Sequence, residues 1–183
     1  MQVAPRILAL GVAGLALTSL PGAARADEMR FGSNDVPTVF FISKSNDRNR
    51  VDYGIRLDAA CAPVNDDAVF PYWREFEKSP VRIHSISFIE KVPYGFSQQK
   101  TLKKGPDGGE QLVKLRQFER PIVVATKRVG DRCVATARAT IKGKSAELVS
   151  VFAKLAGPIS VDYIDVHGRD FGSGAAIEER IQK

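Results

Sequence analysis

The chain has 183 residues, a net charge of +6 at neutral pH and a hydrophobic share of 44%. That length suits a single domain with its own core. The basic excess is modest and interspersed with acids, whereas nucleic-acid-binding domains concentrate basic residues in a patch, so we expect no nucleic-acid partner.

The first 26 residues have the three parts of a secretory signal peptide. Arg6 supplies the positive charge, residues 7–20 are apolar, and Ala24-Arg25-Ala26 has the small-x-small pattern of a cleavage site. No twin-arginine pair precedes the apolar stretch, which favours the general secretory route. Spanning a bilayer takes about 20 apolar residues, so we expect a cleaved signal peptide, a periplasmic or secreted protein, and no integral membrane segment after cleavage.

Cleavage after residue 26 leaves 27–183, which we expect to be a single β-rich domain with a charge of about +4, because Arg6 and Arg25 are removed. The two cysteines, Cys61 and Cys133, allow one intramolecular pairing. In an oxidising compartment an even count indicates a disulfide. A catalytic thiol or a metal ligand are the alternatives, and the lack of a C-x-x-C pair gives them little support.

The mature chain begins with signals for a β-hairpin. Residues 38–43 are rich in β-branched and aromatic residues, and residues 46–49 form a polar turn. Residues 51–57 then alternate, with apolar residues on one face and Asp52 and Arg56 on the other. This period of two predicts a half-buried strand.

The next segment combines aromatic residues with a helix signal. Residues 71–76 fit either a strand or one turn of helix. Ser87 and Glu90 have the spacing of a capping box and predict a short helix, which we expect Pro93 to end. The apolar positions expected on one face of this helix are Ile86, Ile89 and Val92.

Strand signals dominate the rest of the chain. The predicted strands are residues 94–102, 112–118, 121–129, 132–141, 148–155, 159–166 and 176–181. Small residues on one face of 132–141 indicate close packing against a second layer. Frequent turns and the lack of βαβ alternation predict a mainly β domain, an antiparallel β-sandwich or barrel-like fold with one short helix.

The segment Phe40-Phe41-Ile42-Ser43-Lys44-Ser45-Asn46-Asp47-Arg48-Asn49 and its continuation to Asp58 resembles the opening of the family catalogued as domain of unknown function 4833. Residues 61–63, 72–74, 90–95 and 161–168 are also similar to it. Members are small, mostly bacterial and often exported. The family has no established activity, so the resemblance implies the limits of the domain and supplies no catalytic residues.

Two groups of residues have the chemistry of a binding site. The first is the turn that holds Lys44, Asn46, Arg48 and Arg50, whose Arg and Asn side chains suit a carboxylate or a sugar. The alternative is a solvated turn, because Asn and Asp favour turns for backbone reasons.

The second group is Trp73 with Arg74 and Glu77, an aromatic ring beside charges, as in many sugar sites. The alternative is a tryptophan that anchors the core with its N–H satisfied.

A third group has the chemistry of a catalytic site. His167 could act as a general base, with Asp165 or Asp170 orienting it. The alternative is the polar end of a strand. A metal site normally needs three or more converging ligands, and the other histidine, His84, is distant in sequence, so we expect neither a metal nor a cofactor.

These patterns favour a non-catalytic binding module for a cell-envelope component or a partner protein. The alternative is a periplasmic hydrolase that uses His167 with Asp165 or Asp170. The sequence leaves the ligand and the question of catalysis open.

Overall fold

The computed structural model describes residues 38–157 and 160–183, and the predicted signal peptide lies outside the described residues. The described chain contains eleven strands and one helix. The strands are β1 (Phe40–Lys44), β2 (Asp47–Ile55), β3 (Val69–Glu75), β4 (Arg82–Ser85), β5 (Phe96–Gly105), β6 (Gly108–Leu115), β7 (Ile122–Val129), β8 (Arg132–Ile141), β9 (Lys144–Leu155), β10 (Val161–Asp170) and β11 (Ala176–Gln182), and the helix is α1 (Lys91–Tyr94).

All eleven strands belong to one continuous sheet that branches at β9. One path runs β4-β3-β2-β1-β9-β8-β7-β6-β5, while β10 pairs with both β9 and β11. Residues 144–147 of β9 pair with β8, and residues 150–153 pair with β1. The long strand β9 therefore belongs to both halves of the sheet and connects the two layers.

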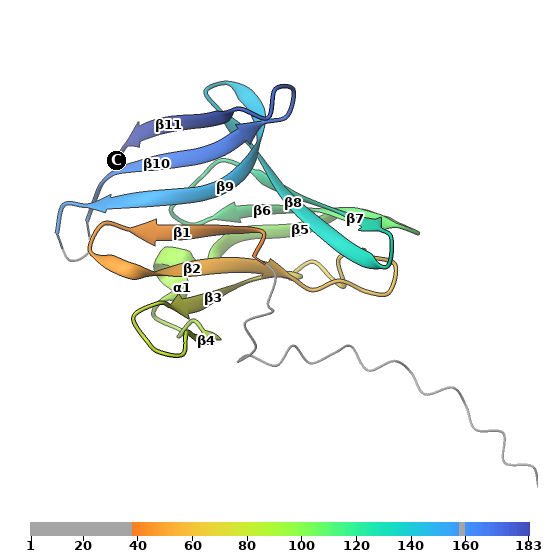
Figure 1. Cartoon of the computed structure of the whole chain (residues 1–183), viewed down its shortest axis with the longest axis horizontal. Coiled ribbons are helices and arrows are strands. Elements are labelled where there is room, and N and C mark those ends of the chain that lie inside the picture. Colours follow the sequence, from red (N-terminus) through yellow and green to blue (C-terminus); the bar gives the residue numbers. More distant parts are fainter. Residues whose placement is uncertain (1–37, 158–159) are drawn as a thin grey trace, which may run out of the picture.

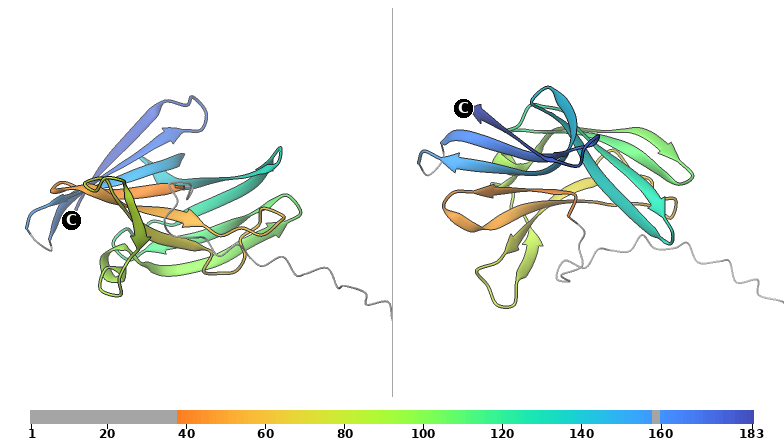
Figure 2. Two further views of the ribbon diagram at one scale, coloured as in Figure 1. Left: turned by 60° about the horizontal axis from the view of Figure 1, so that its bottom comes forward. Right: turned by 45° about the horizontal axis from the view of Figure 1, so that its top comes forward.

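The folded sheet forms two layers around one core. In Figure 1 the strands β11, β10, β9, β1, β2, β3 and β4 follow one another in the front layer, and β5 to β8 lie behind them. Figure 2 shows the layers from two further sides. The core contains residues of both layers, such as Tyr53 of β2, Leu115 of β6 and Ile141 of β8, all fully buried.

This architecture confirms the prediction of a mainly β sandwich-like domain with one short helix. The barrel-like alternative is wrong, because the sheet does not close on itself and keeps free edges. Each described pair of adjacent strands is antiparallel except β1 and β9, which are parallel. The expectation of an antiparallel sheet therefore fails at one pair, where strands distant in sequence meet.

The predicted helix is displaced toward the C-terminus. The capping box forms, since the Ser87 N–H donates to Glu90 at 2.7 Å and the Glu90 N–H donates to the Ser87 hydroxyl at 3.4 Å. The helix begins only after it, at Lys91, and includes Pro93 rather than ending there. Proline is tolerated in a first helical turn, because N–H groups there have no partner within the helix.

The apolar face expected for this helix does not exist. Ile86 is buried, whereas Ile89 and Val92 are 79% and 60% exposed. Their neighbour Phe88 is 85% exposed, so an apolar tip of Phe88, Ile89 and Val92 projects from the molecule.

The predicted disulfide between Cys61 and Cys133 is confirmed, with 5.3 Å between the two Cα atoms. It ties the segment between β2 and β3 to the start of β8. The same segment contacts the other layer, because the Gln111 side chain donates to the Asp66 carbonyl. Among the described residues no helix is long and apolar enough to cross a membrane.

A partly exposed ion pair between Arg120 and Glu179 links the last strand to the loop between β6 and β7 and gives a pH-dependent prediction. Arg120 donates to both carboxylate oxygens of Glu179 at 2.6 and 2.8 Å, and the Lys142 N–H donates at 2.6 Å. The hydrogen bonds from Arg120, with the Lys142 amide second, lower the pKa of Glu179 to about 2. A carboxyl whose pKa falls on folding stabilises the fold above its unfolded pKa.

We therefore expect Glu179→Gln to lower the free energy of unfolding at pH 7. The deficit relative to the wild type should shrink as the pH falls from 4.5 toward 2, the range between the usual and folded pKa values of Glu179. Urea unfolding of both proteins at pH 7, 4.5 and 2.5 measures this difference in the free energy of unfolding. A deficit that stays constant over this range would contradict the assignment.

Candidate functional site

The predicted binding turn exposes Asn46 and Arg48, while its other residues are half-buried. Lys44 forms an ion pair with Asp47 at 3.2 Å, and its ammonium lies 5.6 Å from the Trp73 ring centroid. Asn46 accepts a hydrogen bond from the Ser45 hydroxyl, and Arg48 is exposed. The turn therefore presents Asn46 and Arg48 to solvent, while Lys44 is held by Asp47 and Trp73.

Arg50 of β2 and Arg74 of β3 meet on the outer face of the sheet, around Asp52. Their Nε atoms each donate to the Asp52 carboxylate at 2.6 Å, and the Thr38 hydroxyl donates at 2.7 Å. The Asp52 side chain is 0% exposed, although the alternation of β2 predicted an outward, solvated residue. The second face of β2 is therefore buried as well, which corrects the expectation of a half-buried strand.

Aromatic rings complete this cluster. The Arg50 guanidinium lies 4.1 Å from the Phe41 ring centroid and 5.1 Å from that of Phe76, and Arg74 donates to the Tyr72 hydroxyl at 3.3 Å. Two guanidinium groups held by one buried carboxylate make a structural ion cluster. Sequence reasoning missed Asp52, and the only local signal was Arg50 two residues earlier on the same strand face.

Trp73 faces the opposite way, into the core. Its side chain is 8% exposed, stacks edge-on against Tyr94 at 5.6 Å, and donates from Nε1 to Glu90 at 2.8 Å. Arg74 lies on the other face of β3, and Glu77 is exposed in the turn beyond it. The structure therefore does not bring Trp73, Arg74 and Glu77 together.

Each of the predicted catalytic residues interacts with a partner outside the predicted group. Arg180 donates to both oxygens of Asp165 at 2.7 and 2.8 Å, which lowers the pKa of that carboxyl. Asp170 accepts hydrogen bonds from the Ser173 and Gly172 amides in the turn after β10. Neither carboxylate orients His167, whose Nδ1 lies 3.7 Å from Glu178.

Asp165, one of the predicted catalytic residues, lies on the same face of the sheet as the Arg50–Asp52–Arg74 cluster. Arg50 is in register with Ser43, Ser43 with Phe152, and Phe152 with Asp165. Residues in register lie on one face, so Arg50 and Asp165 belong to one row, three strands or roughly 14 Å apart. This row is too long for the two groups to act on one small ligand.

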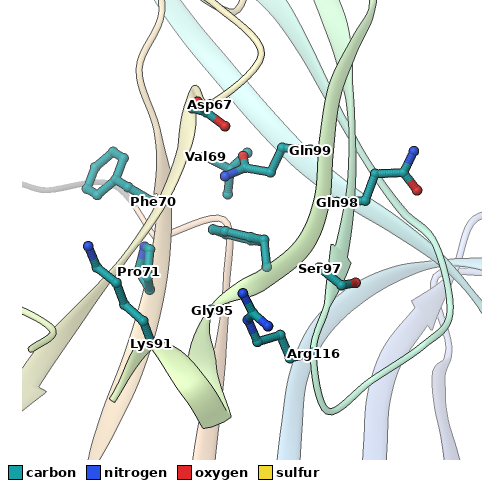
Figure 3. Close-up of a pocket in the computed structure, with 11 residues that line it drawn as sticks. Asp67, Val69, Phe70, Pro71, Lys91, Gly95, Ser97, Gln98, Gln99 and Arg116 are labelled. Atoms are coloured by element: carbon teal, nitrogen blue, oxygen red, sulfur yellow. The ribbon is translucent and has the colours of Figure 1, made fainter. Parts of the chain in front are cut away.

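A cleft of about 400 Å³ opens on the side of the sandwich opposite β9, between β3 and β5. Its walls are Val69, Phe70 and Pro71 from one strand and residues 96–99 from the other. Figure 3 shows Asp67 at one end and Lys91 and Arg116 at the other. The volume lies in the range of small-ligand sites, and apolar walls with a few polar groups are typical of them.

The β3 wall carries unpaired backbone groups. β4 pairs with β3 only from Tyr72 to Glu75, so Val69 and Pro71 have no partner in β4. The Arg56 N–H donates to the Ala68 carbonyl, and hydrogen-bonded residues alternate along an antiparallel pair. Val69 therefore turns its N–H and C=O groups, and Pro71 its C=O group, away from β2 and toward the cleft.

The β5 wall is also a free strand edge. Among the described strands β5 pairs with β6 alone. The Thr101 N–H points away from β6, since it donates to the Asp66 carboxylate at 2.8 Å. Gln99 lies two residues earlier without a bulge between them, so its N–H and C=O point to the same side. The cleft thus lies between two strand edges with unused hydrogen-bonding groups.

One buried acceptor inside the cleft has no partner. The Gln99 Oε1 atom is buried and accepts no hydrogen bond within the described parts of the chain. Figure 3 shows this side chain extending from β5 toward Val69, while Gln98 points away. A buried polar atom without a partner destabilises a fold by about 1–3 kcal/mol, so a rotation of the Gln99 side chain toward a ligand donor in the cleft would relieve that cost.

The charged end of the cleft is available to a ligand. The side chains of Lys91 and Arg116 form no ion pair or hydrogen bond with residues 38–157 or 160–183. Gly95 lies between them, and a side chain at that position would place its Cβ 2.2 Å from the Lys91 carbonyl oxygen. Glycine there lets the chain pass close to the Lys91 carbonyl where α1 ends.

None of the residues singled out in the sequence lines this cleft. The cleft exists because β3 and β5 have no strand partner along it, and side-chain patterns do not encode which strands pair. The available signal was the change along residues 96–104, from uncharged residues to three lysines. No group of three or more residues with metal-binding side chains occurs in the described part of the chain.

Comparison with known proteins gives one finding. The family described as domain of unknown function, DUF4833, matches residues 40–180, which include every described strand at least in part. No match was found among curated proteins or among solved structures. Because the match spans most of the 183 residues, the chain belongs to the DUF4833 family.

Proposed function

We propose that the protein is an exported, non-catalytic binding module that holds a cell-envelope component or a partner protein in the cleft between β3 and β5. The observation that carries this proposal is the buried, unpartnered Oε1 atom of Gln99, a residue that lines a cavity of about 400 Å³. An acceptor kept in this state lowers the stability of the free protein and becomes useful when a ligand donates to it.

Two further observations support the proposal. Lys91 and Arg116 place uncommitted positive charge at one end, and Val69, Pro71 and Phe96 supply apolar contact area. The Cys61–Cys133 disulfide supports export, because such bonds persist in oxidising compartments.

The test uses Gln99→Leu, which removes the unpartnered acceptor and replaces the polar side chain with an apolar one of similar size. We expect this variant to be more stable than the wild type, by up to about 1 kcal/mol, and to bind about threefold to tenfold more weakly. Thermal melting measures stability, and the shift of the midpoint with added probes measures binding. The probes are muropeptides, neutral oligosaccharides and short extended peptides.

Gln117→Leu is the matched control, because Gln117 is exposed and lies outside the cleft. It should change neither stability nor binding. A panel in which no probe raises the midpoint, or equal binding by wild type and Gln99→Leu, would contradict the proposal.

A further inference from the structure

The free edge of β5 is protected along only half of its length. Lys100, Lys103 and Lys104 occupy the half toward the β5–β6 turn, where the Lys104 ammonium donates to the Val64 carbonyl. Asp66 covers the Thr101 N–H on the same half. Proteins protect edge strands from unwanted pairing with lysines or covering loops, and both devices are present here.

The other half, residues 96–99, has neither device. It contains no charged residue, and no described strand pairs with its outer side. This unprotected half coincides with the cleft. An edge left open only where a cleft adjoins it is the arrangement used by proteins that bind a peptide as an added strand.

Both walls of the cleft suit a peptide backbone better than other polymers. On β3, Val69 presents an N–H and a C=O group and Pro71 presents a C=O group two residues later, while Gln99 presents both groups on β5. An extended peptide has donors and acceptors at that same repeat on its two sides. A sugar chain has no such regular match to a strand edge.

The charges give the bound segment a direction. Lys91 and Arg116 lie at the α1 end, and Asp67 lies at the opposite end (Figure 3). A carboxylate at the α1 end would gain charge-assisted hydrogen bonds from groups that have no other described partner. A basic group there would be repelled by both cations.

We propose that the cleft binds an extended, acidic segment of a partner protein, which pairs with β5 at Gln99 and places its carboxylate beside Lys91 and Arg116. This inference rests on the proposed function and specifies its ligand class and binding mode. The apolar tip of Phe88, Ile89 and Val92 adjoins Lys91 and provides further contact area for such a partner.

The test measures hydrogen exchange of the Gln99 amide in the whole protein. The amide should exchange fast in the free protein, because it has no described acceptor, and at least roughly tenfold more slowly with bound peptide. The probe is an acetylated octapeptide of alternating threonine and valine that ends in two glutamates. A second probe ends in two lysines, and a third carries methyl groups on alternate backbone amides of the acidic peptide.

Charge-reversal variants test the direction. Lys91→Glu with Arg116→Glu should weaken binding of the acidic peptide by roughly tenfold or more. Lys127→Glu with Lys154→Glu is the matched control, since both lysines are exposed, lie outside the cleft and give the same change in net charge. This control should leave binding unchanged.

Protection of the Gln99 amide by the acidic peptide, lost on methylation and on charge reversal at the cleft, is the expected result. Equal protection by the acidic and lysine peptides would overturn the acidic preference. Cleft binding by muropeptides or oligosaccharides, with peptides inactive, would overturn the peptide mode and leave the proposed binding function standing. Failure of all probes at the cleft would overturn both.

Discussion

Replacing Asp52 with alanine is expected to lower the free energy of unfolding by about 3–5 kcal/mol, the cost of breaking a buried ion cluster from one side. Asp52 is fully buried and accepts from Arg50 and Arg74, each at 2.6 Å, and from Thr38. Its removal leaves two guanidinium groups close together without their shared counter-charge. Urea unfolding at neutral pH measures the loss.

A surface ion pair provides the matched control. Arg138 and Glu110 lie 2.7 Å apart with 40% and 37% of their side chains exposed. Solvent weakens such pairs, so Glu110→Ala should cost no more than about 1 kcal/mol. Similar losses for Asp52→Ala and Glu110→Ala would show that the Asp52 cluster is not a structural centre of the sheet.

Replacing both cysteines with alanine is expected to lower the free energy of unfolding by about 4 kcal/mol. The bridge joins residues separated by 72 positions, and closing so long a loop restricts the unfolded chain strongly. The effect should appear mainly as a lower denaturant midpoint under oxidising conditions. Replacing both residues avoids a free thiol that could pair between molecules.

Reduction of the wild type gives an independent comparison. A reducing agent should bring the wild type to the stability of the Cys61→Ala/Cys133→Ala variant and leave that variant unchanged. The bridge also anchors the segment whose Asp66 covers part of the β5 edge. The Thr101 amide should therefore exchange faster in the reduced wild type and in the variant than in the oxidised wild type. Equal Thr101 exchange in oxidised and reduced protein would contradict this link between the bridge and the edge.

Local patterns predicted the strands well where each strand has one buried face. Residues 132–141 were predicted as a strand, and β8 has those bounds. Ala137, Ala139 and Ile141 are buried along it as the alternation requires. Such patterns report which face of a strand is covered, and they contain no information about which strand lies beside it. The parallel pairing of β1 with β9 therefore could not be predicted from these patterns.

The candidate sites show the same limit more strongly. Asp52 looked like a solvent-facing residue because Arg74, which helps to bury it, is 22 residues away. The Trp73 side chain was considered for a sugar site, and its core position depends on Glu90 and Tyr94. The cleft arises where β4 is too short to cover β3 and where β5 ends the sheet. Neither fact is a property of any single segment.

The pairing of β1 with β9 also bears on when the chain can fold. Phe41 pairs with Ser150, so the first strand waits for a partner more than a hundred residues later. Contacts of such long range slow folding, because the intervening chain must first be closed into a loop. Before β9 is available, β1 to β4 can pair only among themselves, and β1 keeps one free edge. Completion of the sheet therefore depends on β9, which joins β1 to β8 and also pairs with β10.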